Sequence, residues 1–367
     1  MNCRALLAAL IAVVVVASGC TTPTPDDETV TDASGDGATE PDAGSAPTKS
    51  VVPVPDATTL VTGDTITVAM VPKLKAIDYF NATEQGAKVA AAELGVELIY
   101  DGPIDSRVED QIELINSFIT RKVDVIAVAP NDPDAIAAVL KRARDKGIHV
   151  ITWDADANPE KSQREFFVDQ ASPQGIGASL VDVMAEEAGA DAKTIVITGT
   201  LTAANQNEWM KWMRHRIDEK YPEMEILQVK ASGEDQQRAK QVTQDVLTAH
   251  KDLDGIFAIT SVAFPGAAAA LERSGRVGEV ALTGLSTPKS MRRWVDSGTV
   301  KTVVLWNAVD LGYLTIYAAQ ALCDGKLAPG ITSIDAGTLG TKAVEDDRVV
   351  LGTPMRFTKE NIGDYDF

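Results

Sequence analysis

Polar side chains follow several short apolar runs, at the point where each run ends. Lys73 comes just after Ile66–Val71, and Asp154 directly follows Val150–Trp153. Other apolar runs lead, directly or through a loop, into further amides: Asn131, Asn205, Gln206 and Asn307. The carboxyl ends of parallel strands meet at one edge of a sheet, where open α/β sheets bind ligands. We therefore expect these side chains to form a hydrogen-bonding collar around a small molecule.

Aromatic side chains stand close to the same run ends: Tyr79, Phe80, Trp209 and Trp306. Lysine, aspartate and amide side chains together supply donors and acceptors to hydroxyl groups. Aromatic rings supply the apolar surface of small-molecule sites. This combination suits a small polyol, whose hydroxyls need fixed partners and whose C–H faces pack on rings. We expect Phe80 and Trp306 to face the ligand, and Trp209 to serve in packing.

Catalytic patterns are weak in this chain. The Ser-Thr-Pro-Lys segment at 286–289 matches the S-x-x-K of penicillin-recognising enzymes, but neither S-D-N nor K-T-G follows it. An acid pair such as Asp154 and Asp156 could suggest glycosidase chemistry, but we do not expect the two to share a substrate. The histidines lack metal-ligand spacing: His149, His215 and His250. We therefore expect a binding protein that is not an enzyme and uses neither cofactor nor metal.

From Thr65 onward, short apolar runs alternate with amphipathic helical segments, and these elements must position the polar and aromatic residues. The apolar runs are nearly continuous, as in strands covered on both faces. They are Ile66–Val71, Val123–Ala129, Val150–Trp153, Thr194–Thr198, Gly255–Ile259 and Val280–Leu285. Helical spacing of apolar residues marks segments between them, such as Arg107–Arg121 and Pro173–Ala188. Alternation through about ten units predicts doubly wound parallel α/β sheets, and that many strands favours two sheets.

In the order and spacing of these segments, the sequence resembles the ribose-type (type I) periplasmic binding proteins of ABC importers. It is most similar to the branch that holds rhamnose-binding and autoinducer-2-binding receptors. The resemblance runs from about residue 64 to the C-terminus. It rests on Val71-Pro72-Lys73, Tyr100-Asp101-Gly102-Pro103, Asn131-Asp132-Pro133-Asp134, Ile151-Thr152-Trp153-Asp154, Asn205-Gln206-Asn207-Glu208-Trp209, Thr283-Gly284-Leu285, Leu305-Trp306-Asn307 and Asn361-Ile362-Gly363.

The resemblance implies two α/β lobes joined by a three-strand hinge, with the ligand clamped between the lobes. Carried onto this chain, the N-terminal lobe takes 61–169 and 286–304. The C-terminal lobe takes 170–285 and 305–367. These boundaries are expectations for the structure to test.

The resemblance also implies which residues contact the ligand. The autoinducer contacts of the family fall on Lys73, Asp154, Gln206, Pro265 and Ala267. Asn205 stands where the autoinducer pattern has an aspartate, and Asn205–Asn207 looks instead like the rhamnose-binding side. An amide donates as well as accepts hydrogen bonds, which changes the hydroxyl pattern that is satisfied. We therefore expect a rhamnose-like deoxyhexose or a related sugar, with Pro265 and Ala267 as a small apolar wall for a methyl group.

The first twenty residues have the pattern of an export signal. Arg4 precedes an apolar run, Ala5–Ala17, which ends in small residues before Cys20. This end resembles the lipobox of bacterial lipoproteins, in which the cysteine receives a diacylglycerol. The run is short of the ~20 residues that span a membrane. We expect residues 1–20 to be a lipoprotein signal peptide and Cys20 to anchor the chain at the outer face of the cell membrane.

Residues 21–60 have the composition of a tether. They hold eight acidic residues against the single base Lys49, and they bury too little apolar surface to fold. The net charge of −19 argues against nucleic acid as a partner, because phosphate binding needs clustered lysine and arginine. Cys323 is the one cysteine outside the leader and the lipidation site, so we expect a core thiol and no disulfide.

Together these features predict a monomeric, exported and lipid-anchored solute-binding protein. It would capture a neutral sugar by hinge closure and deliver it to an ABC permease. Two alternatives stay open within the same fold: an autoinducer-2 receptor, and a sugar sensor that signals to a membrane kinase or chemoreceptor. A hydrolase is a third class, which turnover of a bound sugar would reveal.

Overall fold

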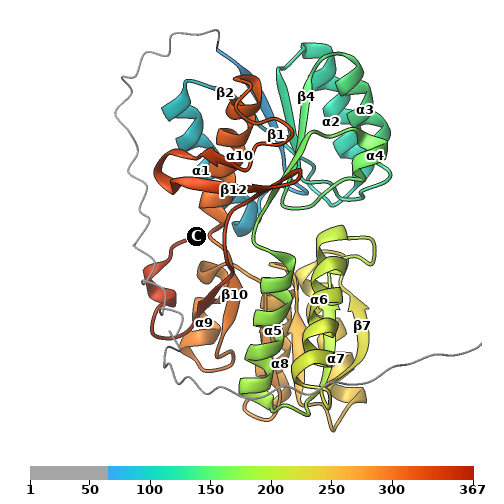
Figure 1. Ribbon diagram of the computed structural model, residues 1–367. Coiled ribbons are helices and arrows are strands. Elements are labelled where there is room, and N and C mark those ends of the chain that lie inside the picture. Colours follow the sequence, from blue (N-terminus) through green and yellow to red (C-terminus); the bar gives the residue numbers. More distant parts are fainter. Residues whose placement is uncertain (1–64) are drawn as a thin grey trace, which may run out of the picture. The chain divides into compact units, whose positions relative to one another are not determined.

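The computed structural model describes residues 65–367, which form two α/β lobes (Figure 1). Cys20, the export signal and the acidic tether lie outside the described residues. The principal strands are β1 (Thr67–Val71), β2 (Glu97–Tyr100), β3 (Val125–Val128), β4 (His149–Trp153), β5 (Phe166–Asp169), β6 (Lys193–Thr198), β7 (Glu225–Ala231), β8 (Gly255–Ala258), β9 (Ala281–Gly284), β10 (Val303–Leu305), β11 (Ser333–Asp335), β12 (Thr341–Glu345), β13 (Arg348–Val350) and β14 (Met355–Phe357).

Helices alternate with these strands. They are α1 (Asp78–Leu94), α2 (Val108–Arg121), α3 (Ala137–Asp145), α4 (Pro159–Ser162), α5 (Pro173–Ala188), α6 (Ala204–Lys220), α7 (Gln236–Ala249), α8 (Ala263–Ser274), α9 (Pro288–Asp296) and α10 (Ala308–Cys323), with short 3₁₀ turns η1 (Gly337–Leu339) and η2 (Ile362–Asp364). The predicted apolar runs coincide with β1, β3, β4, β6, β8 and β9 to within two residues at each end.

The first lobe is built on an eight-stranded sheet with the order β11-β12-β13-β5-β4-β3-β1-β2. The strands from β13 to β2 run parallel, and β12 and β11 extend the sheet in antiparallel fashion. Strand β1 shows why its sequence is continuously apolar. Val68 and Met70 pack on the face covered by α1 and α10, whereas Ala69 and Val71 pack on the face covered by α2 and α3.

Helices α1 and α10 lie against each other at unusually short range. A Cβ atom on Gly86 would lie 1.8 Å from the carbonyl oxygen of Val309, and one on Gly312 would lie 1.9 Å from that of Thr83. Only glycine allows two helix backbones to approach this closely. The pair therefore fixes α1, whose first turn carries Tyr79 and Phe80, relative to the start of α10.

The second lobe is built on a four-stranded parallel sheet with the order β7-β6-β8-β9. The pair α5 and α6 and the pair α7 and α8 pack beside it (Figure 1). A two-stranded antiparallel ribbon of β10 and β14 continues this lobe, because a bridge joins Leu285 after β9 to Val304 in β10.

The chain passes between the lobes three times, as expected, but only the first passage follows a predicted boundary, the one after residue 169. The passages are 170–172 before α5, 306–307 before α10, and 351–354 before β14. The assignment of 286–304 to the first lobe is wrong, because α9 packs on α8 and β10 bridges to β9.

The assignment of the whole of 305–367 to the second lobe is also wrong. Helix α10 packs on α1, and β13 pairs in parallel with β5, so 308–350 belongs to the first lobe. Only the last segment, from β14 onward, returns to the second lobe.

Candidate functional site

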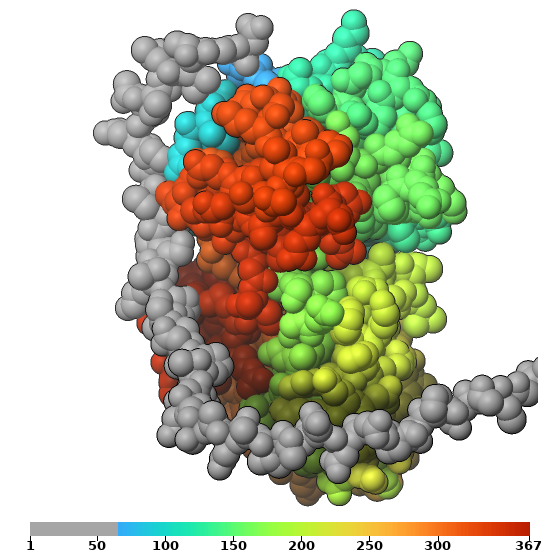
Figure 2. All heavy atoms as spheres, in the orientation of Figure 1, coloured from blue at the N-terminus to red at the C-terminus, as the bar shows by residue number. Residues whose placement is uncertain are grey.

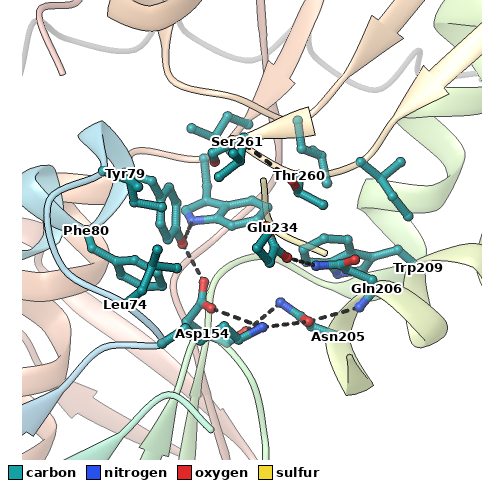
Figure 3. Close-up of a pocket in the computed structure, with 17 residues that line it drawn as sticks. Leu74, Tyr79, Phe80, Asp154, Asn205, Gln206, Trp209, Glu234, Thr260 and Ser261 are labelled. Carbon is teal, nitrogen blue, oxygen red and sulfur yellow. Dashed lines mark hydrogen bonds and ion pairs between the residues drawn. The ribbon is translucent and has the colours of Figure 1, made fainter. Parts of the chain in front are cut away.

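A pocket with an empty volume of about 450 Å³ lies between the carboxyl ends of the two sheets (Figure 3). Both lobes and the second passage contribute to its walls: Lys73, Leu74, Ile77, Tyr79, Phe80, Asp154, Asn205, Gln206, Trp209, Glu234, Ile259, Thr260, Ser261, Val262, Leu285, Leu305 and Trp306.

Asp154 is the fixed acceptor of the first lobe. It follows β4 directly with a backbone φ of 63°, a left-handed conformation that aspartate tolerates better than most residues. Tyr79 Oη donates to Asp154 Oδ1 over 2.6 Å, and Gln170 Nε2 donates to the same oxygen over 3.1 Å. The other oxygen, Oδ2, lies 3.9 Å from Lys73 Nζ. Oδ1 of Asp154 is thus held by Tyr79 and Gln170, while Oδ2 faces Lys73 Nζ.

Tyr79 connects this carboxylate to the aromatic part of the pocket. Burial raises the pKa of Tyr79 well above its usual value, and the charge of Asp154 raises it further, so the phenol stays protonated and donates. Trp306 Nε1 donates to Tyr79 Oη over 2.9 Å, and the two rings stand perpendicular with centroids 6.0 Å apart. The ring centroid of Trp209, in the second lobe, lies 5.7 Å from that of Trp306. Rings from both lobes therefore form one aromatic wall.

The first turn of α6 supplies the amides of the second lobe. Gln206 Oε1 accepts hydrogen bonds from the Thr198 hydroxyl and, over 2.8 Å, from the backbone N–H of Gly199. These two donors fix the orientation of the amide, so that Nε2 faces Glu234 and donates to its Oε1 over 3.0 Å. Gln206 is thus a buried side chain whose acceptor is satisfied and whose donor group is turned toward the pocket.

Lys73 and Asn205 join the two lobes directly. Lys73 Nζ donates to Asn205 Oδ1 over 3.1 Å, and Asn205 Nδ2 donates to the backbone oxygen of Asp154 over 3.4 Å. Lys73 is only 8% exposed, and a buried ammonium needs such partners. The lobes are therefore hydrogen-bonded to each other at the pocket, as in a cleft that has closed.

Six of the side chains predicted to contact a ligand line this pocket: Lys73, Phe80, Asp154, Asn205, Gln206 and Trp306. Two of the others support neighbouring backbone instead. Asn131 Nδ2 donates to the carbonyl oxygen of Lys73 over 2.8 Å, which steadies the loop that carries the lysine. Asn307 caps α10, because its Oδ1 accepts from the N–H groups of Val309 and Asp310.

Pro265 and Ala267 do not form the apolar wall that was predicted for them. Both are buried within α8, away from the pocket surface. The pocket meets the loop before this helix, so Ile259 and Val262 contribute the apolar surface there, together with Leu285.

Trp209 and Glu234 are among the residues that line the pocket but were not predicted to contact the ligand. Trp209, which was expected to serve only in packing, lines the pocket and packs on Trp306 as well. Glu234 was not predicted at all. It follows β7, whose sequence Glu-Ile-Leu-Gln-Val-Lys-Ala lacks a continuous apolar run because the strand lies at a half-exposed edge. The signal that could have found it is the Ser-Gly-Glu-Asp turn just before the amphipathic segment of α7.

The residues that resembled catalytic patterns have structural partners. Ser286 Oγ donates to the backbone oxygen of Ser261, and Asp156 pairs with Arg164 away from the pocket. Cys323 is half-buried, and burial raises its pKa to about 11, so the thiol stays protonated. Within 65–367, no cluster of three potential metal-ligating side chains occurs, and no helix has both the length and the apolar character to cross a membrane.

The sequence profile of the periplasmic binding protein domain matches residues 68–327. The chain belongs to the periplasmic binding protein family. This membership places it outside the cytoplasm, and it accounts for the two sheets, the three passages and the pocket between their carboxyl ends.

Solved periplasmic binding proteins match this chain over most of its length. An ABC transporter solute-binding protein from Clostridium phytofermentas, with bound L-rhamnose, is 30% identical; the match covers 82% of this chain and 98% of that one, with a TM-score of 0.77. LsrB from Clostridium saccharobutylicum, in complex with AI-2, is 27% identical over 82% of this chain and 100% of its own, also with a TM-score of 0.77. The D-ribose/D-allose-binding protein of Pseudomonas aeruginosa is 26% identical over 239 residues, 64% of this chain and 74% of that protein.

Proposed function

We propose that this periplasmic binding protein captures an uncharged sugar between its lobes and delivers it to an ABC permease. The observation that carries the proposal is the pocket, in which charged and amide side chains of both lobes surround a wall of aromatic rings. Hydroxyl groups need such mixed donors and acceptors, and sugar C–H faces need the rings. The relatives that bind ribose, rhamnose and AI-2 support a small polyol of this kind.

Within this class we propose a rhamnose-like deoxyhexose, or a related pentose or hexose, as the ligand. Asn205 supports this choice, because its amide lies at the pocket where the autoinducer pattern has a carboxylate. AI-2 is the competing ligand, since LsrB from Clostridium saccharobutylicum is as similar in fold as the rhamnose-bound protein.

Competitive calorimetry on the full chain in detergent separates these ligands. The panel is L-rhamnose, D-ribose, D-arabinose, D-xylose, D-glucose and AI-2, tested on wild type, Asn205→Asp and the exposed control Asn207→Asp. We expect wild type to bind a sugar of the panel more tightly than AI-2, and Asn205→Asp alone to change the ranking. Tightest binding of AI-2 by wild type would reverse our order of ligands. If Asn205→Asp changes none of the affinities in the panel, Asn205 serves only as a contact between the lobes.

We also propose that a lipid on Cys20 holds the chain at the membrane. The small residues before this cysteine carry the proposal. Cys20→Ser should leave an unprocessed chain that no longer incorporates labelled palmitate. Unchanged incorporation in the variant would place the lipid elsewhere.

Delivery to a permease, rather than signalling, is tested in cells. Deletion of the gene should abolish uptake of the labelled sugar, whereas intact uptake with a lost transcriptional or chemotactic response would favour the sensor.

A further inference from the structure

Glu234 is a charged residue of the pocket, and it differs from Asp154 in its surroundings. It lies in the turn between β7 and α7, and its carboxylate is directed toward Gln206 at the centre of the pocket (Figure 3). Across residues 65–367, no lysine or arginine forms an ion pair with it. Asp154, by contrast, has Lys73 at 3.9 Å.

The backbone around Glu234 is shaped to hold this side chain. Glu234 has a φ of 52° and follows Gly233 with a φ of 69°, so two successive residues are left-handed. A Cβ on Gly199 would lie 1.8 Å from Glu234 Oε1, so the carboxylate packs directly over the Gly199 backbone. The N–H of Gly233 donates to the oxygen of Gly199 over 2.7 Å and ties the two loops together. Non-glycine residues in such conformations concentrate at ligand clamps.

The hydrogen bonds leave part of the carboxylate for a ligand. Gln206 Nε2 donates to Oε1, and in the described part of the chain no donor reaches Oε2. A carboxylate only accepts hydrogen bonds, so whatever faces Glu234 must donate them. The pocket holds two carboxylates, Asp154 and Glu234, against one ammonium, Lys73, which disfavours an anionic ligand.

We propose that Glu234 is a ligand-binding residue that sets specificity, by accepting hydrogen bonds from hydroxyl groups of an uncharged sugar. This inference rests on the proposed function. It adds a second carboxylate, on the opposite lobe from Asp154, so that the ligand must present hydroxyl donors toward both lobes.

Calorimetry with L-rhamnose, D-ribose and D-arabinose on the full chain tests the proposal. Glu234→Gln keeps an acceptor for Gln206 Nε2 and nearly the same volume, but it removes the charge and replaces the other acceptor oxygen by an amide donor. We expect affinity for the tightest-binding of these sugars to fall about tenfold, because hydrogen bonds to charged groups are the stronger ones. Glu223→Gln, an exposed change near the opposite end of β7, should leave affinity within twofold.

The melting temperature of the unliganded protein separates binding from folding. Glu234→Gln should melt within a few degrees of wild type while its affinity falls. Affinity within twofold of wild type, or a loss matched by Glu223→Gln, would overturn the role of Glu234 and leave the proposed function intact. If wild type binds none of the three sugars, the proposed function fails, and this inference fails with it.

Discussion

Asp154 is held in position by protein partners on one side of its carboxylate. Tyr79 and Gln170 both donate to Oδ1, and Trp306 in turn donates to Tyr79. A ligand hydroxyl therefore meets an acceptor whose orientation is already fixed, so little side-chain entropy remains to be lost on binding. Lys73, across the same edge, supplies the matching donor.

Asp154→Asn should reduce affinity for the bound sugar about tenfold. Asparagine keeps an acceptor for Tyr79 and tolerates the φ of 63°, so the fold should persist. The charge-assisted hydrogen bond, worth about 1.5–3 kcal/mol, is what the variant loses. Calorimetry measures the change, with the exposed Asp134→Asn as a matched control. Affinity within twofold of wild type would show that Asp154 makes no such bond to the ligand.

Among single residues, strand-end positions could be predicted and side-chain direction could not. The rule that parallel strands bind at their carboxyl ends found Lys73 and Asp154 correctly as lining residues. The same rule selected Asn131 and Asn307, whose short amides turn back onto nearby backbone groups. This local competition for hydrogen bonds is common for asparagine, and no spacing in the sequence reveals it.

At the scale of elements, the pair α1 and α10 decides where the aromatic wall lies. Tyr79 and Phe80 occupy the first turn of α1, and Trp306 lies two residues before α10. The glycine contacts between the helices hold these two ends at a fixed distance. A shift of one helix along the other would move Tyr79 away from Trp306 and from Asp154.

Gly86→Ala should destabilise the protein by about 1–3 kcal/mol, the usual cost of overpacking. Helix propensity alone would favour alanine by about 1 kcal/mol, so a loss shows that the contact with the Val309 carbonyl dominates. Urea unfolding measures it. Gly363→Ala, at a position with open space and no left-handed φ, should be nearly neutral. A Gly86→Ala variant more stable than wild type would mean that the helices separate at no cost.

Elements buried on both faces could be predicted from the sequence, and half-exposed ones could not. Strands β3 and β8 are buried throughout and appear as continuous apolar runs. Strand β7 alternates between exposed and partly buried residues, and β11 to β13 are short with mixed burial, so they lack that signal. The error in assigning all of 305–367 to one lobe involves β13, whose parallel pairing with β5 is a long-range choice.

At the scale of the whole molecule, three acids have raised pKa values, and two of them lie beside the passages between lobes. Asp169 ends β5 just before the first passage, and Arg348 of β13 lies 3.0 Å from it. Burial raises the pKa of Asp169 to about 7, although Arg348 opposes the shift. Burial likewise raises the pKa of Glu187 to about 7 and that of Asp310, next to the second passage, to about 6.

These acids predict that stability falls as the pH rises from about 4 to about 7. Unfolded carboxyl groups titrate near pH 4, so in this window the folded chain binds more protons than the unfolded chain. The stabilisation is complete below the unfolded pKa and is lost as the pH rises through the folded value. Urea unfolding should give a lower free energy at pH 8 than at pH 5, and Asp169→Asn should reduce the difference. Equal pH dependence in both proteins would remove Asp169 from the explanation.

The space-filling view shows the two lobes meeting along a boundary across the middle of the molecule (Figure 2). The pocket lies within this boundary, and Lys73 and Asn205 bond across it. The account therefore requires the lobes to separate before a ligand enters and to close once it is bound, which is the hinge motion of two-lobed binding proteins.

A crystal structure of the full chain grown with its tightest-binding sugar would show whether both lobes hold the ligand. We expect the sugar in the pocket, with hydroxyl groups within hydrogen-bonding distance of Lys73 and Asp154 on one lobe and of Gln206 or Glu234 on the other. A sugar bound outside this pocket, or held by one lobe with no contact to the other, would contradict this expectation.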